Sequence, residues 1–451
     1  MYNKNDITEL EITALTSDGD GVGRAGDMVF FVPNTAVEDK ILARVLKVKK
    51  NVVFARLEEI ITPSNDRIEP DCSVSRSCGG CVYRHMSYEA ELRAKHKKVY
   101  DAVTRIGKLD GSLVKDIVPS EKISAYRNKA MIPVGLNKDG EAVIGYYARH
   151  SHNIMHCPSC KLSPDIFNSI TEDFYSFIKD RPQLIYSPDN RKGIRHLYLR
   201  LAEKTGEVMV CIIAGAKRFD SDNSLSEHLA EKYPQIKCIE VNVNDEETNV
   251  ILGRNTYPVR GGEFITDELC GLKFEIFAQS FYQINRSQAE RIYGIAKKYA
   301  ALTGEEILLD LYCGTGTIGL SMADKCRKLI GVEIIPEAIK NAKKNAAQNG
   351  VGNARFICAD AAKAALQLRK EGIRPDVIIA DPPRKGLNPE LIDTIVGMAS
   401  KRVVYVSCDP ATLARDLAIF EQNNYHVQEI TPADMFPRTS HVETVVLMIK
   451  K

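Results

Sequence analysis

The spacing of apolar residues in the first 60 positions predicts a small β-barrel. Within a region of short alternating apolar runs, strand-like segments lie at Met28–Val32, Lys40–Val48 and Val52–Glu59. A period of two is typical of half-buried strands. The preceding Ser17–Gly21 is rich in Asp and Gly, which tolerate the backbone conformations of tight turns. We therefore expect residues 1–60 to form the barrel.

Basic and aromatic residues are frequent in the middle of the chain. Glu89–Lys108 has helical spacing with a basic bias, and residues 126–160 mix Tyr and His with Arg and Lys. Bases of a single-stranded nucleic acid can stack on such rings while the cations meet phosphate. The basic run Arg44–Lys50 suits either an RNA-binding face or a protected strand edge. We expect residues 61–270 to form a central α+β domain with an RNA-binding surface, although a plain sheet with scattered charges is the alternative.

From about residue 300 the pattern changes to alternating strands and helices, which predicts an α/β, largely parallel, doubly wound sheet. We assign this domain to residues 271–451. Ser287 and Glu290 have the spacing of a capping box that opens a helix through Tyr299. The predicted strands are Glu306–Leu311, Lys328–Glu333, Arg355–Cys358, Val377–Asp381, Arg402–Ser407 and Glu443–Ile449.

Composition adds constraints on the partners and the compartment. The 451 residues include 61 Lys and Arg against 59 Asp and Glu, a net charge of +2. This balance gives no global sign of a nucleic-acid partner, so such a surface would be local. No run approaches the roughly 18 apolar residues of a membrane span, and the N-terminus lacks the apolar core of a secretory signal. We expect a cytoplasmic monomer whose clustered cysteines stay reduced and serve metal binding or catalysis.

A glycine-rich loop between a strand and a helix is the first candidate binding site. The apolar strand Ile307–Leu311 leads into Tyr312–Gly316, and the next predicted strand ends at Glu333. Glycines let the backbone approach a ligand closely, and an acid at that strand end can accept hydrogen bonds from both ribose hydroxyls. A nucleoside-containing cofactor is therefore indicated. No Gly-Lys-Ser/Thr sequence follows, which argues against a phosphate-binding loop.

The acidic residues near the strand ends decide between cofactors. Gly319 would supply the third glycine of a dinucleotide fingerprint, so the loop alone does not exclude NAD. Asp310, Asp360 and Asp381 favour S-adenosylmethionine, because carboxylates can meet its amino group, ribose and adenine amine but would repel a pyrophosphate. Asp360 is equally well placed to be the N-cap of a helix.

Cys408 is the candidate nucleophile. It follows the apolar strand Arg402–Ser407, and ligands of doubly wound sheets bind at the carboxyl ends of strands. A single Cys is more often inert packing, and this one needs a lowered pKa or an adjacent base to react. A thiolate together with a methyl donor suggests methylation of a pyrimidine at C5, because thiolate addition to C6 makes C5 enolate-like. Glu443 is the candidate base for the C5 proton, and His441 is the second candidate.

The motif Asp381–Arg384 reads Asp-Pro-Pro-Arg. A cytosine enzyme would usually place a Cys after a Pro in this motif. Its absence favours uracil.

Three thiols lie within ten residues at Cys72, Cys78 and Cys81, with two glycines between the last two. A fourth ligand would come from Cys157 or Cys160. Zinc held by two Cys-x2-Cys pairs would leave Cys72 unexplained. A 4Fe-4S cluster uses all three clustered thiols and is favoured over zinc.

Together these residues resemble the RNA (uracil-5-)methyltransferase family, in particular its bacterial 23S ribosomal branch, which carries a TRAM barrel and an iron–sulfur cluster. The resemblance covers nearly the whole chain. The matching motifs are Gly19–Arg24, Cys72 with Cys78–Cys81, Tyr126–Lys129, Ser280–Asn285, Asp310–Gly314, Asp381–Arg384, Ser407–Pro410 and His441–Glu443.

The resemblance implies a Rossmann-like domain that uses S-adenosylmethionine to methylate C5 of a single-stranded or loop uridine in 23S ribosomal RNA, giving 5-methyluridine. Cys408 would bond covalently to C6, and Glu443 would remove the C5 proton. The implied methyl-donor ligands are Gln283, Tyr312, Glu333, Asp381 and Asp360. The implied ligands of a 4Fe-4S cluster are Cys72, Cys78, Cys81 and Cys157.

Two other functions compete with this one. A transfer-RNA uridine methyltransferase is the first, although that branch looks shorter and lacks the barrel and the cluster. The second is a non-catalytic iron–sulfur RNA-binding protein, which would have no reason to keep both Cys408 and Glu443.

Overall fold

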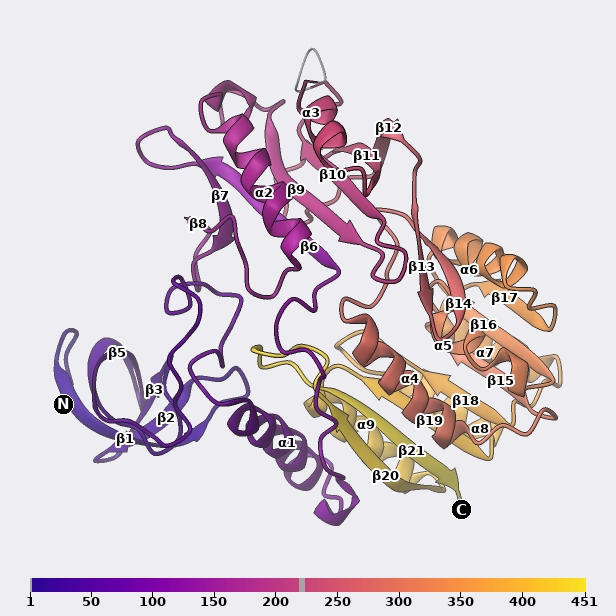
Figure 1. Cartoon of the computed structure of the whole chain (residues 1–451). Helices are drawn as coiled ribbons and strands as arrows, with labels where there is room; N and C mark the ends of the chain where they lie inside the picture. The colour runs from indigo at the N-terminus through magenta and orange to yellow at the C-terminus, as the bar shows by residue number, and fades with distance from the viewer. Residues whose placement is uncertain (1, 219–223) are drawn as a thin grey trace. The chain divides into compact units, whose positions relative to one another are not determined.

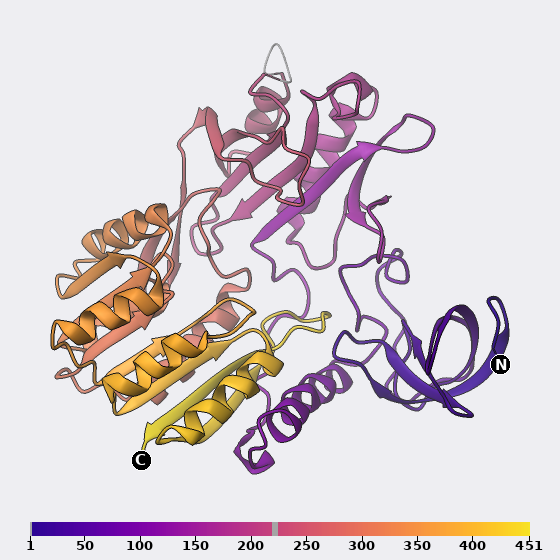
Figure 2. The same ribbon diagram turned by 180° about the vertical axis from the view of Figure 1, so that it is seen from behind.

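The computed structural model describes residues 2–218 and 224–451 and divides into two compact units (Figures 1 and 2). Unit 1 comprises Met1–Lys98, Tyr146–Met155 and Phe436–His441, and unit 2 comprises Val99–Gly145, His156–Met435 and Val442–Lys451. The predicted domain borders at residues 60 and 270 stay predictions.

Unit 1 contains a closed barrel over residues 7–62, which confirms the predicted small β-barrel. Inward residues alternate with outward ones, and Phe30, Ile41 and Val53 are among its fully buried side chains. Closure leaves no unpaired strand edge. The strands pair in the order β1-β2-β3-β5-β4, with bounds β1 Ile7–Leu15, β2 Gly21–Ala25, β3 Met28–Val32, β4 Lys40–Lys49 and β5 Val52–Thr62.

The basic helix predicted over Glu89–Lys108 is present as α1, Tyr88–Arg105. It ends before Gly107 and Lys108, and the φ of +53° at Lys108 is incompatible with a continued helix. The border between the two units falls inside α1, after Lys98.

A second sheet, most of whose residues belong to unit 2, follows the cysteine-rich segment. Its strand order is β12-β11-β10-β9-β6-β7-β8. Helix α2 buries Phe167, Ile170 and Phe174, the apolar stripe of an amphipathic helix. The bounds are β6 Lys129–Leu136, β7 Ala142–Tyr147, β8 Ile154–His156, α2 Asp165–Ile178, β9 Ile194–Leu201, β10 Val208–Ala214, α3 Ser224–Lys232, β11 Ile236–Val243, β12 Asn255–Gly261 and the hairpin β13 Ile265–Leu269 with β14 Leu272–Ile276.

The C-terminal part of unit 2 is the predicted doubly wound sheet, with strand order β17-β16-β15-β18-β19-β21-β20. Strands β15 to β19 run parallel, and β21 is antiparallel to both of its neighbours. Helix α4 covers one face in Figure 1, and α8 and α9 cover the other in Figure 2. The strands are β15 Ile307–Leu311, β16 Lys328–Glu333, β17 Ala354–Cys358, β18 Val377–Ala380, β19 Arg402–Ser407, β20 Tyr425–Ala433 and β21 Glu443–Lys450. The helices are α4 Arg286–Ala300, α5 Thr317–Leu320, α6 Pro336–Gln348, α7 Ala361–Lys370, α8 Pro389–Met398 and α9 Pro410–Gln422.

All six strands predicted for this sheet are confirmed within two residues at each end. Their apolar runs match strands that are buried on both faces. Strand β20 was not predicted, because its exposed half carries polar residues and the run contains Pro432.

The predicted capping box of α4 is wrong. The N-cap is Asn285, whose side chain accepts a hydrogen bond from the backbone N–H of Gln288. Ser287 lies inside the first turn and donates its hydroxyl to Asn285 at 3.2 Å, while Glu290 forms an ion pair with Arg286 at 2.8 Å. A buried Asn with other partners has displaced the local Ser-Glu pair as the cap.

None of the helices in the described parts of the chain is long and apolar enough to cross a membrane.

Candidate functional site

The loop after β15 turns sharply in order to start α5. Tyr312, Gly314 and Gly316 have positive φ values of 63°, 55° and 85°. Asp310, which is 1% exposed, accepts a hydrogen bond from the N–H of Gly319 at 2.9 Å. A Cβ at Gly319 would lie 2.6 Å from that carboxylate oxygen, so the helix can approach only with glycine there. Asp310 therefore fixes the loop against the start of α5, and its own side chain is buried.

Glu333 ends β16 against this loop. Its carboxylate accepts hydrogen bonds from the backbone N–H of Gly314 at 3.2 Å, Ile334 at 2.8 Å and Ile335 at 3.0 Å. The side chain is only partly buried. The structure thus brings the acid and the glycine loop together, as the sequence predicts.

Tyr312 lies among the acids of this edge. Burial raises the pKa of its hydroxyl, and the charges of Asp360, Asp416 and Glu333 add to that rise. Asp360 is the N-cap of α7, where it accepts hydrogen bonds from Ala362 and Lys363. The structure thus confirms the second role that the sequence suggested for Asp360, the N-cap of a helix.

Gln283 is hydrogen bonded to Tyr293 of α4. The sequence analysis did not single out Tyr293. The Tyr293 hydroxyl lies 3.0 Å from that of Thr317, at the start of α5. Burial raises the pKa of Tyr293, whereas hydrogen bonds with Thr317 and Gln283 lower it and the charge of Asp381 raises it. Tyr293 thus connects three elements that lie far apart in the sequence.

The reactive residues meet at the edge of the sheet where β19 ends and β21 begins. Ser407 and Thr444 are register partners, so Cys408 and Glu443 are the next residues beyond that pair. Asp381 follows β18, the neighbour of β19 on its other side. The three predicted residues therefore share one edge.

Burial dominates the electrostatics of this group. Burial, together with the charge of Asp381, raises the pKa of Glu443 to about 8. Burial raises the pKa of Cys408 to about 11, and the charges of Glu443 and Asp381 add to the effect. Desolvation also raises the pKa of Asp381 to about 7. Arg384 opposes the rise at Cys408 and Glu443, so it is the cation that faces both.

His441, the second candidate base, belongs to unit 1 together with Phe436. Their rings lie edge to face with centroids 6.0 Å apart.

The cysteines predicted to bind a metal are divided between the two units. Cys72, Cys78 and Cys81 are partly buried in unit 1, and Cys157 is buried in unit 2, where its thiol donates to the backbone oxygen of Ser159 at 3.2 Å. Across residues 2–218 and 224–451, no group of three His, Cys, Asp or Glu side chains is arranged to hold a metal ion. The cluster therefore stays a prediction, and no catalytic step is derived through one.

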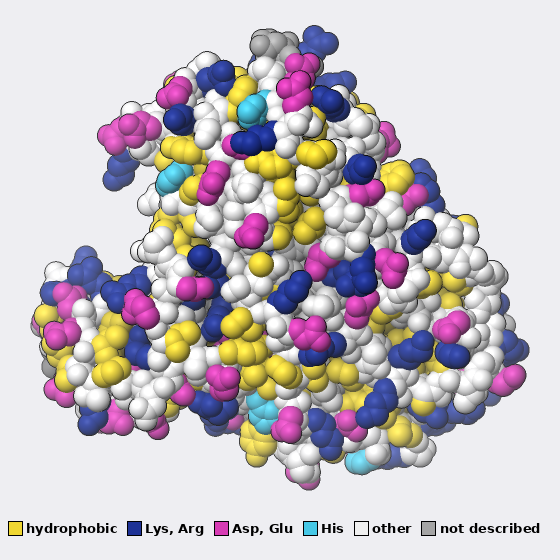
Figure 3. All heavy atoms as spheres, viewed as in Figure 1, with side chains coloured by type: hydrophobic (Ala, Val, Ile, Leu, Met, Phe, Trp, Pro, Cys, Tyr) yellow, Lys and Arg dark blue, Asp and Glu magenta, His cyan; other side chains and the backbone are white. Residues whose placement is uncertain are grey.

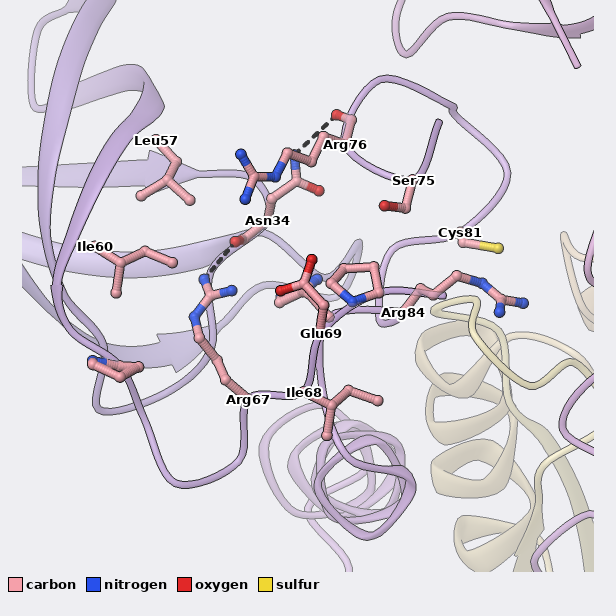
Figure 4. A pocket seen from close by; sticks show the side chains of 13 residues that line it. Asn34, Leu57, Ile60, Arg67, Ile68, Glu69, Ser75, Arg76, Cys81 and Arg84 are labelled. Atoms are coloured by element: carbon pink, nitrogen blue, oxygen red, sulfur yellow. Dashed lines mark hydrogen bonds between the residues drawn. The ribbon is translucent and has the colours of Figure 1, made fainter. Parts of the chain in front are cut away.

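Unit 1 also has a pocket of about 390 Å³ between the barrel and the cysteine-rich segment (Figure 4). Arg67 donates to the backbone oxygen of Asn34 at 2.7 Å, and the Asn34 amide donates to the backbone of Arg76 at 3.1 Å. Leu57 and Ile60 of β5 form its apolar side. None of the predicted catalytic or methyl-donor residues lines it.

Comparison with known families decides the assignment. The family model described as tRNA (Uracil-5-)-methyltransferase matches residues 205–451, more than half of the chain. The chain belongs to this uracil-5-methyltransferase family. A TRAM domain model matches residues 3–57, which form most of the barrel.

The uracil-5-methyltransferase family assignment agrees with full-length relatives. Proteins described as uncharacterized RNA methyltransferases are 40% identical in Staphylococcus aureus, over 98% of each chain, and in Halalkalibacterium halodurans, over 99% of this chain and 97% of the relative.

A solved structure matches over the same length. The tRNA (uracil-54, C5)-methyltransferase of Pyrococcus abyssi, in complex with S-adenosyl-L-homocysteine, has a TM-score of 0.79 and 28% identity, and covers 98% of this chain and 99% of its own. These findings confirm the predicted methyltransferase fold. This uracil-5-methyltransferase is an S-adenosylmethionine-dependent enzyme that acts on RNA.

Proposed function

We propose that this enzyme methylates C5 of a uridine in 23S ribosomal RNA through a covalent bond between Cys408 and C6. The observation that carries the proposal is the shared site of Cys408, Glu443 and Asp381, where the charge of each carboxylate acts on the thiol. A thiol and a carboxyl of raised pKa in one desolvated site are the nucleophile and base that C5 methylation needs.

The chemistry divides between these residues. The Cys408 sulfur bonds to C6 and pushes electron density to C5, and S-adenosylmethionine supplies the methyl group as an electrophilic sulfonium. Glu443 then takes the proton from C5. The electrons of the broken C5–H bond restore the C5–C6 double bond, and the C6–S bond breaks to release the thiolate.

The raised pKa of Glu443 suits a base, whereas the raised pKa of Cys408 means that its thiol must lose a proton before it can attack. The pKa of Glu443, about 8, makes it a stronger base than an exposed carboxylate at neutral pH. At neutral pH the raised pKa of Cys408 favours the protonated thiol, which is less prone to oxidation than the thiolate. Arg384 faces both groups and favours the thiolate once a substrate is in place.

The methyl donor is assigned to the residues around the glycine loop. Glu333 already accepts backbone hydrogen bonds at the loop, and an acid there can receive the ribose hydroxyls. Tyr312 lies between Glu333 and Asp360, and Gln283 and Asp381 flank Tyr293. These contacts support Gln283, Tyr312, Glu333, Asp381 and Asp360 as the binding set.

Transfer RNA is a second candidate substrate. Chain length does not distinguish the ribosomal-RNA branch of the family from the transfer-RNA branch, because the structure of a tRNA enzyme covers 98% of this chain. The match includes the barrel, so the proposal of ribosomal RNA rests on the clustered cysteines, which the resemblance associates with the ribosomal branch.

A deletion strain distinguishes the two RNA substrates. We expect mass-spectrometric mapping to show loss of 5-methyluridine from 23S ribosomal RNA, restored by the wild-type chain but not by Cys408→Ala. Loss from transfer RNA alone would replace the ribosomal proposal with the second candidate. Restoration by Cys408→Ala would refute the covalent mechanism.

We also propose that Cys72, Cys78, Cys81 and Cys157 hold a 4Fe-4S cluster, with zinc as the alternative. The spacing of the three clustered thiols supports this. The N–H of Gly80 points at the Cys78 sulfur at 3.4 Å, and Arg84 is hydrogen bonded to Cys81. Such donors stabilise thiolate sulfur.

A further inference from the structure

Two cations face each other on the central sheet of unit 2. Strands β6 and β9 are antiparallel, and Lys129 and Arg200 are direct register partners. Directly opposite residues point to the same face of a sheet, and like charges in such a pair destabilise it.

Arg200 is only partly satisfied although it is 1% exposed. One guanidinium nitrogen, Nη1, donates to the backbone oxygens of Phe277 and Ser280, each at 2.9 Å. Its Nε and Nη2 have no hydrogen-bond partner. Buried guanidinium groups are usually hydrogen bonded on all sides, because an unpaired buried donor costs free energy.

Lys129 is partly buried and faces this guanidinium. Burial, together with the charge of Arg200, lowers the pKa of Lys129 to about 8. In the described chain, neither Lys129 nor Arg200 forms an ion pair with a carboxylate. The pair is therefore an uncompensated positive site, which an anion would stabilise.

The pair adjoins the segment that carries Gln283. Asn128 precedes Lys129 in the chain. It donates its backbone N–H to the backbone oxygen of Ile284 at 2.9 Å and its side-chain amide to the backbone oxygen of Gln283 at 2.8 Å. The two Arg200 bonds to Phe277 and Ser280 hold the start of the same segment. An anion at Lys129 would thus lie beside the residues assigned to the methyl donor.

We propose that Lys129 binds a phosphodiester group of the RNA substrate, with Arg200 as a buried second cation that positions the segment from Phe277 to Gln283. Lys129 is the less buried member of the pair, so it makes the contact. RNA is the anion that this enzyme must hold, and ammonium groups contact phosphates as point charges. The inference rests on the RNA substrate of the proposed function. The competing anion is the carboxylate of S-adenosylmethionine.

Binding measurements on the full-length protein show whether Lys129 binds the RNA phosphodiester or the carboxylate of the methyl donor. The probes are a fluorescent 20-nucleotide oligouridylate, titrated at several salt concentrations, and S-adenosylhomocysteine. For Lys129→Gln we expect the RNA Kd to rise about five- to tenfold and the slope of log Kd against log salt to fall by about 0.7, as for one lost phosphate contact. The Kd for S-adenosylhomocysteine should stay unchanged. Lys138→Gln, on the exposed turn after β6, is the matched control and should behave as wild type.

Lys129→Arg keeps the charge and should restore the salt slope, which a purely structural role would not predict. If Lys129→Gln does not fold, lysine acylation of the wild-type protein replaces it, and RNA should protect Lys129 more than Lys138. An unchanged RNA Kd and slope, a weakened affinity for S-adenosylhomocysteine alone, or no protection of Lys129 would each overturn the inference. Failure of the wild-type protein to bind oligouridylate would instead count against the proposed function.

Discussion

At the scale of single residues, Cys408, Glu443 and Asp381 share one desolvated edge of the sheet, and burial raises the pKa of each. Two carboxyls and a thiol in such a place repel one another as anions, so burial and this repulsion favour their protonated forms. The sulfonium charge of the methyl donor and the charge of Arg384 would shift this balance toward the anions.

The pH dependence of product formation follows from the raised pKa of Glu443. Below its value of about 8 the carboxyl is protonated and cannot accept the C5 proton, whereas above it the carboxylate can. We expect kcat, which includes proton removal after methyl transfer, to rise about tenfold per pH unit below pH 8 and to level off above it. Steady-state rates from pH 6 to 9 test this, and a profile that is flat from pH 6 would contradict the assignment.

At the scale of elements, Asn285 joins the start of α4 to two other segments. It is 1% exposed, caps the helix, and donates its amide to Ser120 at 3.3 Å and to the backbone of Met435 at 3.1 Å. A buried side chain with this many partners stabilises more than a cap on the surface does.

Asn285→Ala should therefore destabilise the protein by about 2–4 kcal/mol, because it removes a cap and leaves buried partners unsatisfied. The matched control is Asn388→Ala, which removes the exposed N-cap of α8 and its bond from Leu391. That change should cost about 1 kcal/mol. Thermal unfolding followed by circular dichroism compares the two, and an equal or smaller loss at Asn285 would refute this role.

The same helix illustrates what local sequence can predict. Strands β16 and β19 match their predicted bounds because uniform apolar runs between turns read clearly as buried strands. The cap of α4 and the role of Tyr293 were missed, since both depend on contacts with distant segments. Gln283 was assigned only through the family resemblance, because a lone partly buried Gln carries no local signal.

At the scale of the whole molecule, charge is distributed without a dominant sign. Figure 3 shows Lys and Arg side chains mixed with Asp and Glu over the face in view, in keeping with a net charge of +2. Binding to RNA must therefore rely on local cations, the role that we propose for Lys129, rather than on a global field.

The clustered cysteines give a prediction for the purified protein as a whole. Anaerobic purification should yield a brown protein with about four irons and four sulfides, and Cys78→Ser should lose them, because a cysteine ligand is removed. Cys326→Ser, which changes a buried cysteine outside the proposed set, is the control and should keep them. Stoichiometric zinc without sulfide would contradict the iron–sulfur assignment.

The central claim is that Cys408 and Glu443 act as nucleophile and base on uridine. The most direct test incubates Glu443→Gln with S-adenosylmethionine and radiolabelled RNA that the wild-type enzyme methylates, followed by a denaturing gel. A methylated, denaturant-resistant protein–RNA band should accumulate, because the C5 proton stays in place and Cys408 cannot leave. The band should be absent from the double variant with Cys408→Ala. Normal turnover without a trapped band would contradict the account.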